Sequence, residues 1–167
     1  TAEVQAIVDA YNAIKANADG TANNYATNPT QTQYALIGVT GVDTAAKTSL
    51  LGDVIDGKAF AAVDTVAEVQ ELARIASAIQ TVAAGGTPSP ALTVADLTKM
   101  GLNTTGVTAG NLPTLLDSIA AANTTGADTL AELQTLVDNL DKVAPTTPAS
   151  APASYADNVG TITSTAS

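Results

Sequence analysis

The fold is decided by a helix start that occurs three times in the chain: Ala2-Glu3-Val4-Gln5, Ala67-Glu68-Val69-Gln70 and Ala131-Glu132-Leu133-Gln134. The three glutamates are separated by 65 and then 64 residues. Self-similarity at a fixed period is typical of proteins built from repeated supersecondary units, each of which buries its apolar face against a neighbour. The sequence therefore predicts a repeat array within its 167 residues.

Apolar residues follow the first two starts at the spacing of an amphipathic helix. The segment from 2 to about 18 carries Val4, Ile7, Val8, Tyr11 and Ile14, and the segment at 66–84 carries Val69, Leu72, Ala73, Ala76 and Ile79. We interpret both stripes as core packing. Aromatic residues make up only 3% of the chain, so the predicted core consists of small side chains.

Two of the three helix starts carry a capping box, in which a Thr and the Glu three residues later satisfy each other's free backbone donors. These pairs are Thr65 with Glu68 and Thr129 with Glu132. In the first copy the equivalent cap would lie before Thr1. We therefore expect the chain to be a piece of a longer protein or a processed product.

Each unit is predicted to contain two further helices. The first is short, begins after Thr30 or Thr93 and ends at Gly38 or Gly101, and the second spans about 44–57 or 109–122. Because Pro113 is tolerated only in a first turn, we expect the helix of the second unit to begin near Asn111. The predicted fold class is thus all-α, with two three-helix repeats and a closing helix. The boundaries that we assign are 1–65 for repeat 1, 66–130 for repeat 2, and 131–143 for the closing helix, which is a truncated third repeat.

The composition changes after the closing helix. Pro145, Pro148 and Pro152 predict an extended linker at 144–154. The segment 155–167 is predicted to be extended and to contain a short strand that includes Val159, Thr161, Ile162 and Thr163. A single strand needs a partner edge. We therefore expect it to lead to another domain or to pair with another subunit.

Charge and composition exclude several classes of function. A net charge of −10 with six basic residues disfavours nucleic acid and anionic membrane surfaces as partners. The chain has no Cys and no His, so disulfides, Cys/His zinc sites and His-dependent catalytic triads are excluded. No run approaches the roughly 18 apolar residues of a membrane span. We predict that the protein is not an enzyme and needs no cofactor.

Acidic side chains offer calcium as an alternative ligand, because calcium prefers several oxygen donors. The candidates are Asp53 and Asp56 in the third helix of repeat 1, and Asp157 and Asn158 after the linker. The sequence contains no D-x-D-x-D-G calcium loop. For Asp53 and Asp56 we therefore favour a solvated helix face.

Two stretches, Tyr34–Asp43 (YALIGVTGVD) and Asp64–Gln70 (DTVAEVQ), resemble helical repeats of giant bacterial surface adhesins of the Bap-like or RTX type. The tail Ser154–Ser167 (SYADNVGTITSTAS) is similar to the linker and first strand that lead into their bacterial Ig-like repeats. The order of helices is also similar to that of three-helix albumin-binding modules, although no binding-face signature is present. The adhesin resemblance implies an exported, modular protein of the cell surface and implies no catalytic residue.

Two functions follow as expectations. The first is a structural and interaction module, a repeat spacer in cell adhesion or biofilm formation, whose partners are neighbouring repeats or Ig-like domains of the same long chain. The alternative is a self-assembling subunit of an extracellular filament or surface layer, in which the segment near 159–163 pairs with an identical subunit. Both place the protein outside the cell.

Overall fold

The computed structural model describes residues 1–24 and 28–140, and the predicted all-α class is confirmed for this part of the chain. These residues contain no named strand, only an isolated antiparallel bridge between Asp19 and Ala59. The predicted linker at 144–154 and the extended segment at 155–167 lie outside the described residues. So does the end of the predicted closing helix.

The described residues form seven α-helices and one short 3-10 helix. In chain order they are α1 (Ala2–Asn17), α2 (Gln31–Leu36), α3 (Ala45–Asp56), η1 (Phe60–Ala62), α4 (Val66–Ala83), α5 (Val94–Lys99), α6 (Leu112–Ala122) and α7 (Leu130–Leu140).

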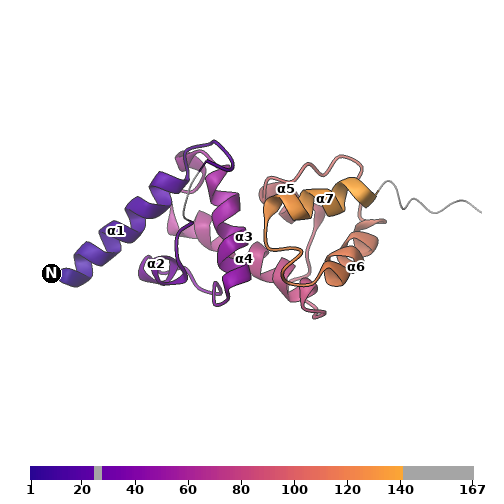
Figure 1. The fold of residues 1–167 in the computed structure, drawn as a ribbon, viewed down its shortest axis with the longest axis horizontal. Helices are drawn as coiled ribbons and strands as arrows, with labels where there is room; N and C mark the ends of the chain where they lie inside the picture. The colour runs from indigo at the N-terminus through magenta and orange to yellow at the C-terminus, as the bar shows by residue number, and fades with distance from the viewer. Residues whose placement is uncertain (25–27, 141–167) are drawn as a thin grey trace, which may run out of the picture.

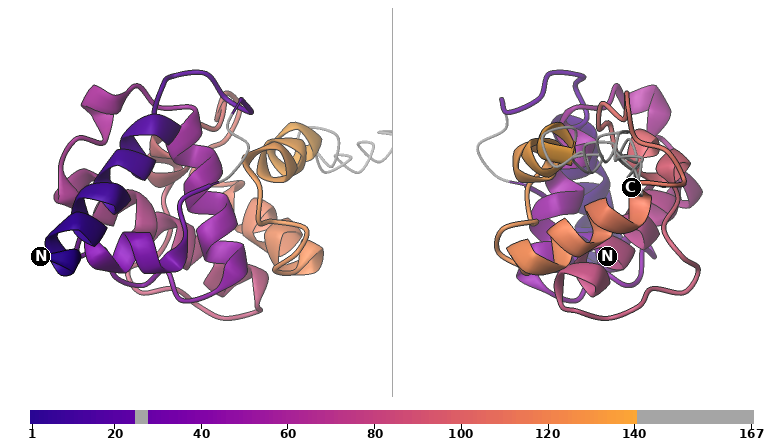
Figure 2. Two further views of the ribbon diagram at one scale, coloured as in Figure 1. Left: turned by 60° about the vertical axis from the view of Figure 1, so that its left-hand side comes forward. Right: turned by 90° about the vertical axis from the view of Figure 1, so that its right-hand side faces the viewer.

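The helices are arranged along one long axis, with α1 to α3 towards one end and α5 to α7 towards the other (Figure 1). The central helix α4 packs against α3 and against α6. At the far end α7 packs against α6, and the two helices lie next to each other in the end-on view of Figure 2. The N-terminal end of α1 projects beyond the other helices (Figure 1).

Threonine side chains begin five of these helices, and for α7 the threonine is Thr129, which accepts the Glu132 N–H. Thr30, Thr44, Thr65 and Thr93 each adopt an extended backbone conformation and accept a hydrogen bond from the N–H three residues later. This contact satisfies one of the donors that the first turn of a helix leaves free. The short helices then end as predicted, because Gly38 and Gly101 follow them with φ of +90° and +97°, a conformation that favours glycine.

The core is continuous through α4. Ala73 and Ala76 are buried in this helix, and their small side chains allow close approach of its neighbours. Leu50 and Leu115 occupy matching positions in α3 and α6, and both are buried. Gly52 in α3 permits a close approach of the 28–30 segment, since an added Cβ would lie 2.3 Å from the side chain of Asn28.

Two expectations about the helices are corrected by the structure. The apolar stripe of α1 is not uniformly core, because Val4, Ile7, Val8 and Tyr11 are exposed and Ile14 alone of that set is buried. The helical period identifies an apolar face but does not say whether anything covers it.

The start of α6 near Asn111 is confirmed: the helix begins at Leu112 with Asn111 as its N-cap residue and Pro113 in its first turn, and Thr108 and Asn111 exchange hydrogen bonds in a turn ahead of it. The second correction concerns the connector between α3 and α4. The 3-10 helix η1 between α3 and α4 was not expected from the sequence.

Candidate interaction site

The repeated helix start builds a reciprocal cap at the N-termini of α4 and α7. Thr65 Oγ1 accepts the Glu68 N–H at 3.2 Å, and Glu68 Oε2 accepts the Thr65 N–H at 3.0 Å. Thr129 and Glu132 make the same pair of bonds at 3.3 and 3.2 Å. The hydrogen bonds from Thr65 hold the pKa of the Glu68 carboxyl below its usual value.

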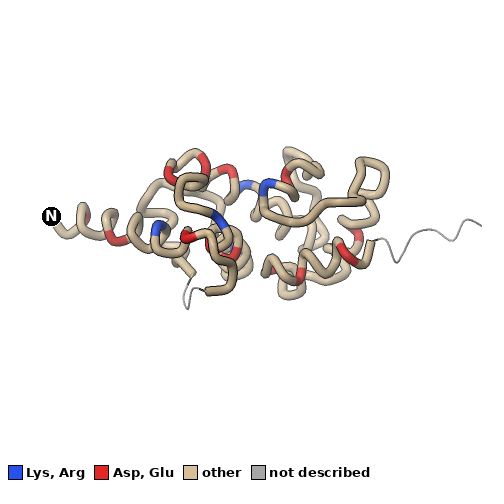
Figure 3. Tube along the Cα trace, turned by 90° about the horizontal axis from the view of Figure 1, so that it is seen from above, with Lys and Arg blue, Asp and Glu red and all other residues tan. Residues whose placement is uncertain are grey.

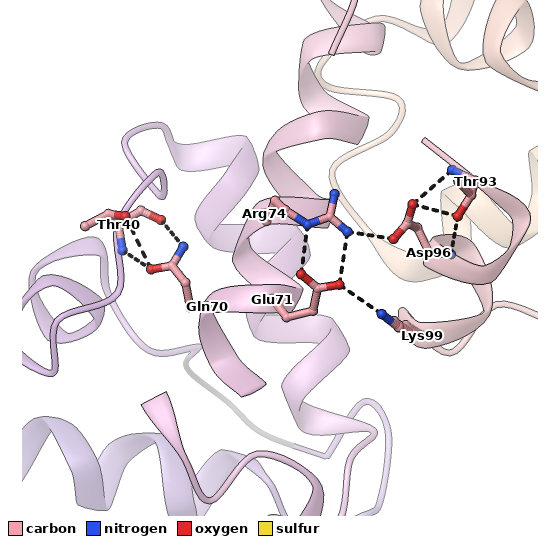
Figure 4. A network of polar contacts seen from close by, with 7 residues as sticks. All are labelled: Thr40, Gln70, Glu71, Arg74, Thr93, Asp96 and Lys99. Atoms are coloured by element: carbon pink, nitrogen blue, oxygen red, sulfur yellow. Dashed lines mark hydrogen bonds and ion pairs between the residues drawn. The ribbon is translucent and has the colours of Figure 1, made fainter. Parts of the chain in front are cut away.

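The fourth residue of the repeated start, a glutamine, joins each of these helices to the loop after the preceding short helix. Gln70 accepts the Thr40 N–H at 2.8 Å and donates to the Thr40 carbonyl at 3.1 Å (Figure 4). Gln134 repeats this clamp on Asn103, at 2.8 and 3.3 Å. The two clamps lie 63–64 residues apart in sequence and use the same atoms. We call them the glutamine joints.

A network of charged side chains lies next to the first glutamine joint on α4 (Figure 4). Arg74 Nε donates to Glu71 at 2.8 Å and Arg74 Nη2 contacts Asp96 of α5 at 2.6 Å. Lys99, at the end of α5, donates to the same Glu71 at 2.9 Å. Asp96 also completes the cap of α5 with Thr93. The network therefore fastens α5 to α4 by a cap and an ion pair that share one carboxylate.

The network lowers the pKa of its carboxyl groups. Hydrogen bonds from Arg74 and then Lys99 bring the pKa of Glu71 from its ordinary 4.5 to about 2. For Asp96, burial opposes ionisation, but the hydrogen bonds from Thr93 and Arg74 outweigh it, and its pKa is also lowered. Both carboxylates are thus held in the charged form.

Acidic residues outnumber basic ones and occur along the whole described length (Figure 3). Helices α6 and α7 contain no Lys or Arg. Asp128, just before α7, has a raised pKa because burial and the neighbouring Glu132 disfavour its charge. Of the four ion pairs among the described residues, three belong to the α4–α5 network and the fourth joins Lys47 to Asp43.

The calcium candidates of α3 occupy structural positions instead. Asp56 is buried, against the expectation of a solvated face, and it accepts the backbone N–H of Asn23. Asp53 is half-buried; it accepts from the Asn28 side chain at 3.2 Å and from the Leu130 N–H at 3.3 Å. The second of these bonds connects α3 to the start of α7 across the molecule.

Within residues 1–24 and 28–140 no three acidic side chains are grouped to hold a metal ion. The other two candidates, Asp157 and Asn158, lie outside the described residues, and so do Val159, Thr161, Ile162 and Thr163 of the predicted strand.

Several polar side chains in the described part are buried among the packed helices. The Tyr34 ring is fully buried with its hydroxyl unpaired, and burial raises the pKa of that hydroxyl. Asn17 donates to the Gly52 carbonyl at 2.9 Å and Gln80 donates to the carbonyl of Ala127. None of the helices in the described part is long and apolar enough to cross a membrane.

The glutamine joints were missed by reasoning from the sequence, although the signal was present. Glutamine is the fourth residue of all three copies of the repeated start, at 5, 70 and 134. From the helical spacing alone such a glutamine is interpreted as a solvated surface residue. Its hydrogen-bond partner lies 30 residues away in a loop, so the local sequence does not indicate it. Its recurrence at a fixed place in the repeat was the clue.

Comparison of this chain with protein-family models, with curated proteins and with solved structures found no match.

Proposed function

We propose that this chain is a structural and interaction module: a helical repeat spacer of a large secreted bacterial surface adhesin, acting in cell adhesion or biofilm formation. In this role it holds other domains at a distance and performs no catalysis. Its partners are neighbouring repeats or Ig-like domains of the same polypeptide. Its place is the outside of the bacterial cell.

The observation that carries this proposal is the recurrence of the glutamine joint. The proposed units are 1–65 and 66–130, each with three helices, followed by the closing helix that begins near 131. Gln70 opens the second unit and clamps Thr40 of the first, and Gln134 opens the closing helix and clamps Asn103 of the second. One interface used twice in one direction suits a stack of units that grows along a line.

The shape of the described part supports the same role. The helices follow one another along a long axis, and the central α4 belongs to the contacts of both units (Figure 1). Such sharing stiffens the connection, because moving one unit relative to the other would separate buried residues of α4 from α3 or α6. A stiff, acidic, elongated module is suited to spacing other domains.

A surface-display experiment tests the spacer role. A sugar-binding head is displayed on bacteria either directly on a membrane anchor or through this chain, and capture of sugar-coated beads is measured beneath a polymer layer of set thickness. Capture is expected to rise when the chain is present. The matched control displays the chain without the head and is expected to capture nothing. Adhesion by this control would show that the chain itself binds a target and would contradict the spacer proposal.

The self-assembly alternative is tested on the purified chain. We expect a monomer by sedimentation both with and without residues 154–167. Filaments that disappear on this deletion would overturn the spacer proposal in favour of pairing through the 159–163 segment.

A further inference from the structure

The first half of α1 exposes an apolar face. Val4, Ile7, Val8 and Tyr11 are 59%, 45%, 44% and 43% exposed. They recur at the spacing of one helix face, so they form a single stripe. Contiguous exposed apolar surface of this kind marks an interaction site more often than isolated residues do.

The same stripe is buried in both later copies of the helix. Val69, Ala73 and Ala76 of α4 stand 65 residues after Val4, Val8 and Tyr11, and each is buried. Their counterparts in α7 are also buried, and these are Leu133, Val137 and Leu140. The three helices thus share one apolar face, and only the copy in α1 is uncovered among the described residues.

In both later copies the helix packs against the third helix of the preceding unit. Helix α4 packs on α3 and α7 packs on α6, and α4 also packs on α6 of its own unit. A glutamine joint ties α4 and α7 to the loop that precedes that third helix. The same two elements of the preceding unit, the loop after its short helix and its third helix, therefore contact the helix both times.

Gln5 of α1 is already arranged for such a joint. Its side-chain nitrogen donates to Asp9 Oδ1 at 2.8 Å. Gln134 donates to Asp138 Oδ1 at the same 2.8 Å while also clamping Asn103. Within the described residues Asp9 is the sole hydrogen-bond partner of the Gln5 side chain, and Gln5 is exposed.

A groove adjoins the stripe. It has a volume of about 370 Å³ and lies between α1, the end of α2 and the start of α4. The Tyr11 ring meets the Phe60 ring edge to face, with centroids 5.7 Å apart, so one wall of the groove is fixed. Leu36 and Val66, also exposed, extend the apolar surface on the other side.

We propose that the exposed face of α1, with Gln5 at its edge, is the docking surface for one more unit of this same repeat. The element that docks is a helix pair of the α2–α3 type, which places its third helix on Val4, Val8 and Tyr11 and its loop backbone on Gln5. This inference rests on the proposed stacking of repeat units and names the surface through which a unit is added ahead of α1.

The test adds such a unit to the full chain. In the extended chain residues 1–65 are repeated ahead of Thr1, so that Thr65 of the added unit directly precedes the original helix start. The protein has no cysteine, so Val8→Cys in the original α1 introduces a single thiol. Its rate of reaction with a small thiol reagent is expected to fall at least about tenfold in the extended chain, since the residue becomes buried.

Ala2→Cys is the matched control, because its counterpart Ala67 is exposed in α4 and the thiol should react equally in both chains. Gln5→Ala provides a second readout that does not depend on labelling. It is expected to leave Tm unchanged in the natural chain and to lower Tm by about 2–4 °C in the extended chain, where its amide gains a backbone partner.

Equal reactivity of Val8→Cys in both chains would overturn the docking surface. Protection already present in the natural chain, with a dimer mass by sedimentation, would also overturn it, because a second copy would then be the occupant. Neither result bears on bead capture by displayed cells, so a failed docking surface and a failed spacer role are distinguished.

Discussion

Helices α1 and α4 carry the same four residues, Ala-Glu-Val-Gln, in their first turns, but the packing around these residues differs. In α4 the Val is buried and the Gln clamps a loop, whereas in α1 the Val is 59% exposed and the Gln bonds only within its own helix. The comparison separates two kinds of information. The repeated residues specify a helix start and an interface together, and the interface forms where a preceding unit supplies its other half.

The largest difference is expected for truncation of the apolar stripe. Leu72→Ala in α4 should lower the free energy of unfolding by about 2–5 kcal/mol, because Leu72 is buried and its loss leaves a cavity. Ile7→Ala, the matched change in α1, should stay within about 0.5 kcal/mol, since Ile7 is exposed. Denaturant unfolding of both variants measures the contrast. Equal losses would mean that the face of α1 is covered in solution.

A smaller effect is expected where α5 is fastened to α4. Asp96→Ala removes the acceptor of the Thr93 N–H in the α5 capping box and the partner of Arg74 together, and should cost about 1–3 kcal/mol. The matched Gln33→Ala in α2 removes a capping partner alone and should cost about 0.5–1 kcal/mol. Thermal unfolding of the two variants measures the two losses of stability. A loss for Gln33→Ala as large as that for Asp96→Ala would mean that the ion pair to Arg74 does not stabilise the fold.

The cap of α4 is expected to contribute less. Thr65→Ala should lower the free energy of unfolding by about 0.5–2 kcal/mol, because the hydrogen bonds of the Thr65 hydroxyl to Glu68 are lost. Thr1 makes no side-chain cap, so Thr1→Ala should have no measurable effect. Unfolding of both variants in urea measures the two free energies. If Thr65→Ala leaves the free energy of unfolding unchanged, the reciprocal cap does not define where the second unit begins.

The smallest effect is a dependence on acid. The pKa of Glu71 is lowered from 4.5 to about 2 in the folded state, so its contribution to stability is present above pH 4.5 and is lost as pH falls towards 2. Asp128 acts in the opposite direction, because its raised pKa means that ionisation of its carboxyl destabilises the fold. Melting curves between pH 7 and 2 should therefore show a shallower acid loss for Glu71→Gln, and Asp128→Asn should raise Tm slightly at pH 7.

Local rules account for the parts of this fold that the sequence predicts. The Thr-capped starts and the glycines after the short helices depend on residues within one turn of each other, and these features lie where the pattern of residues places them. The start of α6 also follows from adjacent residues, because Pro113 has to lie in the first turn of the helix and Asn111 stands directly before Leu112. Prediction is reliable where the determinants are adjacent in sequence.

Long-range partners account for what the sequence did not show. Nothing in the local sequence distinguishes Val4 from Val69, because the burial of each side chain depends on which other elements pack against its helix. Asp53 resembled a solvated carboxylate, and it instead bonds to Leu130, 77 residues away. Periodicity identifies which side chains are available for contact, and only the packed structure identifies the contacts.

The central claim is that the glutamine of the repeated start is a joint between units. The most direct test is the free energy of unfolding of Gln70→Ala, Gln134→Ala and Gln5→Ala in the natural chain. We predict losses of about 0.5–1.5 kcal/mol for the first two, each of which breaks a two-bond clamp, and no loss for Gln5→Ala. The same loss in all three, or in none, would contradict the account.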